Sequence, residues 1–149
     1  MKFFFLFLTL AICFFTNGQP KASSVKTYIS NYQVDEASVT ASTANFKIII
    51  DETKLSAETN GYGYIKFIQQ NEVLMNLKTK YWKTTKDEGG TTKWFNLFGS
   101  AKFNILRITN YQKPQNVKGE VYKSIVILSN YDADGTRLND LGFLSNQIN

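Results

Sequence analysis

The sequence predicts an all-β fold: an antiparallel meander in a small β-sandwich or a partly open barrel. Three observations favour it. Alternating, aromatic-rich segments fill residues 62–111, short polar breaks separate them, and no long segment has convincing helical periodicity. A chain of 149 residues with 43% hydrophobic and 19% charged residues is typical of one globular domain.

The N-terminus has the pattern of a secretory signal. Lys2 precedes an apolar run over residues 3–15, and a short polar stretch ends at Gly18. The run is shorter than the roughly twenty residues that span a membrane. We therefore expect a signal peptide at 1–18, a single all-β domain at 19–149, no membrane span, and a secreted, periplasmic or cell-envelope location.

Cys13, the only cysteine, lies inside the predicted signal. An alternative interpretation makes it an acylated lipoprotein cysteine, but bulky Ile12 stands where such a site needs a small residue. If the signal is removed, the mature chain has no thiol, and no disulfide stabilises its core.

Several kinds of catalysis are excluded by composition. The chain has no histidine, which removes Ser-His-Asp and Cys-His nucleophilic machinery and histidine-ligated zinc. The acidic pairs at 35–36, 51–52 and 87–88 are neighbours at turns and make poor carboxylate dyads. We expect no enzyme, although two separated carboxylates that meet in space are the remaining hydrolytic alternative.

The charge is positive and dispersed. Seventeen Lys and Arg face twelve Asp and Glu, a net charge of +5, and loss of Lys2 with the signal leaves +4. No block of like charge occurs, so the excess is typical of solvated strand faces, and we expect no nucleic-acid partner.

The elements are predicted in order from their β-forming residues and breaks. The expected strands are 25–34, 46–50, 62–69, a strand beginning at Val73, 91–98, 101–111 and 121–129. Residues 39–45 are ambiguous and 113–116 are expected to form a loop around Pro114. In the tail, Leu138, Leu141, Leu144 and Ile148 fit a helical stripe. Gly142 would cost that helix about 1 kcal/mol, so a short C-terminal helix and a last strand both stay open.

The hairpin at Gly89-Gly90 sets the predicted geometry of the central segments. A five-residue loop over 86–90 pairs Thr85 with Thr91, which places Tyr81 opposite Phe95 and Trp82 opposite Trp94. The apolar face then contains Leu77, Tyr81, Phe95 and Leu97. A four-residue loop would shift the register by one and move Trp94 to the apolar side, so the five-residue loop is preferred.

The two tryptophans have two interpretations. Trp82 and Trp94 either stabilise the sheet as a cross-strand aromatic pair, or form a platform for a glycan or protein ligand, with Lys80 and Asn96 supplying hydrogen bonds. Exposure of both rings would favour the platform. The alternative function is a structural or assembly component of the cell envelope.

An acidic loop follows the predicted strand 121–129. Asn130, Asp132 and Asp134 alternate before Gly135, which is similar to the first half of a calcium loop. Leu141 stands where such a loop needs a bidentate glutamate. The alternative is a turn in which aspartate side chains accept hydrogen bonds from backbone amides. Calcium is thus the one metal that the sequence suggests, and no other cofactor is expected.

Overall fold

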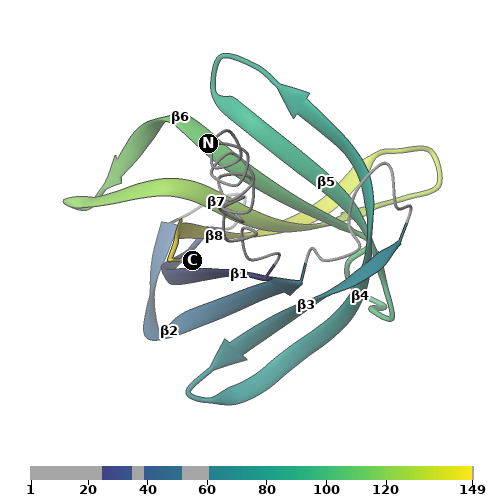
Figure 1. Cartoon of the computed structure of the whole chain (residues 1–149), viewed down its shortest axis with the longest axis horizontal. Coiled ribbons are helices and arrows are strands. Elements are labelled where there is room, and N and C mark those ends of the chain that lie inside the picture. The colour runs from purple at the N-terminus through teal and green to yellow at the C-terminus, as the bar shows by residue number, and fades with distance from the viewer. Residues whose placement is uncertain (1–24, 35–38, 52–60, 149) are drawn as a thin grey trace, which may run out of the picture.

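The protein is one antiparallel sheet whose eight strands follow one another around a ring, as a computed structural model shows (Figure 1). The structure describes residues 25–34, 39–51 and 61–148, with side chains from residue 45 onward in the second range. The strands are β1 (Val25–Val34), β2 (Val39–Asp51), β3 (Tyr62–Gln69), β4 (Glu72–Lys86), β5 (Gly90–Phe98), β6 (Ile105–Val117), β7 (Glu120–Tyr131) and β8 (Arg137–Gln147). The predicted signal and Cys13 lie outside the described residues.

The ring is closed by the pairing of β1 with β8, from Tyr28 opposite Gln147 to Val34 opposite Gly142. The predicted all-β antiparallel meander is therefore confirmed. Its sheet is a single closed ring, rather than two facing sheets or a barrel with an open side. No helix occurs among the described residues.

The C-terminal segment forms β8 and not a helix, so the strand alternative is the right one for the tail. Leu141 lies opposite Leu128, and Phe143 lies opposite Val126. The leucine spacing resembles a helical stripe, but β1 and β7 both need a partner on this side, and the non-local pairing overrides local periodicity.

The predicted five-residue hairpin loop is wrong, but the predicted core register is right. Lys86 pairs with Thr91, so four residues separate the paired positions. An extra residue in β4, Trp82, then restores the register, and Tyr81 lies opposite Phe95 as predicted. Such a β-bulge places two residues of one strand opposite one of its neighbour. Trp94 consequently faces Lys83 in the ladder rather than Trp82.

A second bulge explains another difference. Leu74 is the extra residue of β4 between Met75, which pairs with Phe67, and Val73, which pairs with Ile68. Alternation therefore fails before Met75. Val73 is 57% exposed, although it stands an even number of residues before the buried Leu77 and simple alternation would bury it too.

Strand β6 also differs from its prediction. It begins at Ile105, because Ser100 Oγ accepts hydrogen bonds from the amides of Lys102 and Phe103 and holds the preceding segment as a loop. It continues past Pro114 to Val117, where a loop was expected. Pro114 is tolerated because it lies in a register break between Asn110 and Gln115, where no ladder bond needs its missing N–H. The β6–β7 hairpin reaches beyond the ring (Figure 1).

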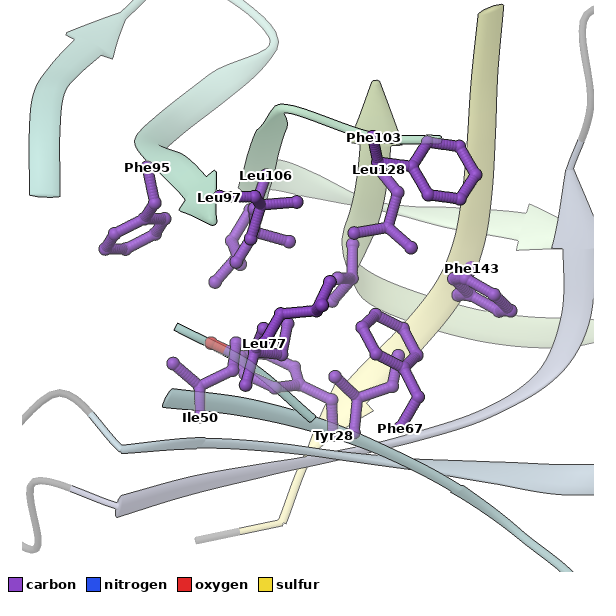
Figure 2. Close-up of a cluster of buried hydrophobic side chains, with 14 of the residues drawn as sticks. Tyr28, Ile50, Phe67, Leu77, Phe95, Leu97, Phe103, Leu106, Leu128 and Phe143 are labelled. Carbon is purple, nitrogen blue, oxygen red and sulfur yellow. The ribbon is translucent and has the colours of Figure 1, made fainter. Parts of the chain in front are cut away.

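The interior of the ring is filled by side chains from all eight strands. Phe143, 2% exposed, packs against Phe46 and Phe67 with ring centroids 4.9 and 5.4 Å apart. Figure 2 shows side chains from different strands pointing toward one another across this core. The predicted apolar face belongs to it: Leu77, Phe95 and Leu97 are buried and Tyr81 packs against them. An eight-stranded barrel has an interior just wide enough to be filled in this way.

Gly90 is required by a close approach of two strands. Its φ is +153°, and a Cβ there would lie 2.1 Å from the carbonyl oxygen of Asn110 on β6. That oxygen belongs to the backbone and has little freedom to move.

We predict that Gly90→Ala lowers the free energy of unfolding by about 3 kcal/mol or more, because it combines a backbone clash with an unfavourable φ. Gly119→Ala is the matched control: its φ is +85° but nothing lies within 4 Å, so it should lose only about 1–2 kcal/mol. Urea unfolding of both variants measures the difference, and equal losses would contradict the close-approach explanation.

Candidate binding surface

The two tryptophans lie together on the outer wall of the ring, with ring centroids 6.1 Å apart and planes at 81°. They differ in exposure. Trp82, the extra residue of the bulge, is 51% exposed, whereas Trp94 is half-buried. The sequence thus placed both residues on one face, although the edge-to-face contact arises from a bulge rather than from direct pairing.

Trp94 is fixed from several sides. Its indole Nε1 donates a hydrogen bond to Thr85 Oγ1 at 3.0 Å. The Arg107 guanidinium lies 5.3 Å from its ring centroid and also forms a 2.6 Å ion pair with Asp140. These contacts tie β4, β5, β6 and β8 together, so Trp94 stabilises the sheet.

A second aromatic pair, which sequence reasoning missed, stands on the same wall. Tyr62 of β3 meets Phe98 of β5 edge to face, with centroids 5.7 Å apart, and the two side chains are 42% and 43% exposed. The register brings them near the predicted residues, because Lys80 lies opposite both Tyr62 and Asn96. Alternation on β3 was the signal that could have revealed Tyr62.

Lysine ammonium groups lie over these rings. Lys78 Nζ is 3.8 Å and Lys80 Nζ is 5.6 Å from the Tyr62 centroid. Lys83 Nζ is 4.2 Å from the Trp82 centroid and 5.0 Å from that of Trp94. A cation within about 6 Å of a ring centroid is attracted by the ring's quadrupole. We call the set Tyr62, Lys78, Lys80, Trp82, Lys83, Trp94, Asn96 and Phe98 the aromatic wall.

An open depression of about 410 Å³ continues the wall toward β1 and β2. Tyr64, Lys66 and Asn76 contribute to its lining, together with Asp51. Tyr64 lies opposite Lys78 in the register, so the depression adjoins the aromatic wall directly. It adds an aromatic ring, an amide, a lysine and an aspartate to the same outer surface.

The acidic loop between β7 and β8 is a turn organised by one aspartate. Asp132 Oδ1 accepts hydrogen bonds from the amides of Asp134 and Thr136 at 3.0 and 2.8 Å. Asn130 pairs with Asn139 in the ladder, and Gly135 has a φ of +81°. Within the described ranges, no group of three His, Cys, Asp or Glu side chains is placed to hold a metal ion. Calcium binding by Asn130, Asp132 and Asp134 stays a prediction.

A hydrogen-bonded triad joins β1 to the start of β7, beside the turn of the β6–β7 hairpin. Tyr122 O–H lies 2.6 Å from both Glu120 Oε2 and Asn31 Oδ1, and Asn31 Nδ2 donates to Glu120 Oε2 at 2.8 Å. The hydrogen bond from Tyr122, with that from Asn31, holds the pKa of Glu120 below its usual value. Burial raises the pKa of Tyr122, and the Glu120 carboxylate raises it further. The triad fixes the hairpin to β1.

Comparisons with protein-family models, curated proteins and solved structures find no match to this chain. The described ranges contain no helix that is long and apolar enough to cross a membrane.

We predict that the triad makes stability depend on acid pH. Folding lowers the pKa of Glu120 from its ordinary value of 4.5. The contribution of Glu120 to the free energy of unfolding is therefore fully present above pH 4.5 and is lost as the pH falls through the lower pKa of the folded state. Tyr122→Phe removes the largest cause of that shift, so its unfolding free energy should vary less across this acid range. Urea titrations at several pH values measure it. Tyr64→Phe, on the outer wall of β3, is the control and should match the wild type.

The calcium prediction is tested by melting. An ion bound only by the folded state would raise the melting temperature, so EDTA should lower it and excess calcium should restore it. Asp134→Asn should abolish the response, while Asp87→Asn, at the opposite end of the ring, should keep it. A melting temperature that neither EDTA nor calcium changes would contradict calcium binding.

Proposed function

We propose that this chain is an exported, non-catalytic β domain that binds a glycan through its aromatic wall. The observation that carries the proposal is Trp82: a large apolar ring, half exposed, held outward by a bulge among other exposed rings. Bulges commonly re-aim a side chain next to a functional site. Four aromatic rings gathered on one wall are more than the scattered exposure normal for a protein surface.

The location of the site follows from packing. The ring interior is occupied by the aromatic and aliphatic core, so the wall offers what the interior does not: exposed flat rings beside uncharged and cationic donors. Sugar rings stack on aromatic faces, and Asn96, Lys78 and Lys80 stand within the same two strands to bond hydroxyl groups. A protein ligand is the alternative that the same aromatic surface would serve.

Trp82→Ala should abolish glycan retention and leave the melting temperature nearly unchanged, because the lost ring is half exposed. Affinity electrophoresis in gels containing soluble polysaccharides, with thermal melting in parallel, measures both. Trp94→Ala should lower the unfolding free energy by about 1–2 kcal/mol more than Trp82→Ala does, since beyond the aromatic pair that both variants lose it removes the hydrogen bond to Thr85 and the Arg107 contact.

Leu138→Ala is the matched control. Leu138 is 54% exposed on β8, across the ring from β4, and its loss should change neither retention nor melting. If the Trp82→Ala variant is still retained by the polysaccharide, or if its melting temperature drops strongly, Trp82 and Trp94 have a purely structural role.

A further inference from the structure

We infer that the ligand of the aromatic wall is an acidic polysaccharide, whose carboxylates pair with Lys78, Lys80 and Lys83 while its sugar rings lie against Tyr62 and Trp82. The inference rests on the proposed function and names its substrate class. It comes from the charge on the wall, which the aromatic rings alone do not explain.

The three lysines have no carboxylate partner within the part of the chain that the structure describes. Their contacts there are with rings: Lys78 and Lys80 with Tyr62, and Lys83 with both tryptophans. Arg107 differs, because Asp140 already neutralises it at 2.6 Å. The lysines are therefore the cations of the wall that are available to an anion.

The outward positions of β4 and β5 within the aromatic wall contain no acidic residue. From Asn76 to Lys83 and from Trp94 to Phe98, the outward side chains are aromatic, amide or lysine. The ammonium groups of Lys78 and Lys80 lie 3.8 and 5.6 Å from the centroid of the same ring, so their like charges repel each other. An anion between them would relieve this repulsion, and a neutral sugar would not.

A chain of linked acidic sugars fits this pattern better than other polyanions. Lys78 and Lys80 are alternate residues of one strand, about 7 Å apart along it, and lie beside aromatic rings, so charge and stacking surface alternate along the wall. A lipid surface is entered by apolar side chains that protrude from a loop or helix face, whereas these rings lie in the wall of a sheet. The predicted export signal separates the chain from cytoplasmic nucleic acid.

The test uses three acidic polymers, polygalacturonate, alginate and hyaluronate, and fully methyl-esterified polygalacturonate as the neutral match. Affinity electrophoresis of the mature chain should show retention by at least one acidic polymer, weaker retention by the ester, and loss of the preference in high salt. The double variant Lys78→Gln/Lys80→Gln should bind the acidic polymer on the order of tenfold more weakly. The control Lys123→Gln, on β7, should bind as the wild type does.

The outcomes separate this inference from the proposed function. Equal binding of the acidic polymer and its ester, or binding of neutral polysaccharides alone, overturns the acidic preference and leaves the glycan proposal standing. Binding to no polysaccharide overturns both. Tighter binding to poly(dT) or to phosphatidylglycerol vesicles than to every acidic polymer would replace the ligand class.

Discussion

Closure of the ring by β1 and β8 is the constraint from which the rest of the molecule follows. Once β1 pairs with β8, no strand has a free edge, and every inward side chain must fit a space fixed by eight strands. Phe143 lies in that space in contact with Phe46 and Phe67. Since the interior is filled by the core, any ligand that uses large aromatic surfaces must be met on the outside of the ring.

The outer wall acquires its shape from the length of one strand. Between Lys86 and Tyr81, β4 has one residue more than β5 has between Thr91 and Phe95, and Trp82 is that residue. The surplus leaves the core contact of Tyr81 with Phe95 intact, with ring centroids 6.0 Å apart. The same local register thus gives both the packing of the core and the outward position of Trp82, and neither disturbs the other.

Local alternation was enough to predict much of this fold. The bounds 25–34 and 62–69, the order of the strands and the apolar face around Leu77 are as expected, because each is encoded in residues close in sequence. The bulges at Leu74 and Trp82 were not predicted, since an extra residue changes the register without changing the composition. The leucines of β8 show the same limit: β1, one of the two partner strands of β8, is distant in sequence, and pairing with it is not encoded in the local pattern.

The sequence predicted only part of the candidate site. Trp82, Trp94, Lys80 and Asn96 were found because they share one hairpin, and Tyr62 was missed because β3 brings it there through pairing with Lys80. The complete wall changes the physical argument, because the lysines then lie over rings rather than in open solvent. Cations held over aromatic faces are fixed in position before any anion arrives, which lowers the ordering cost that flexible lysines would add to binding. If the wall binds a glycan as proposed, its combination of fixed charge and stacking surface would favour ligands that carry both features.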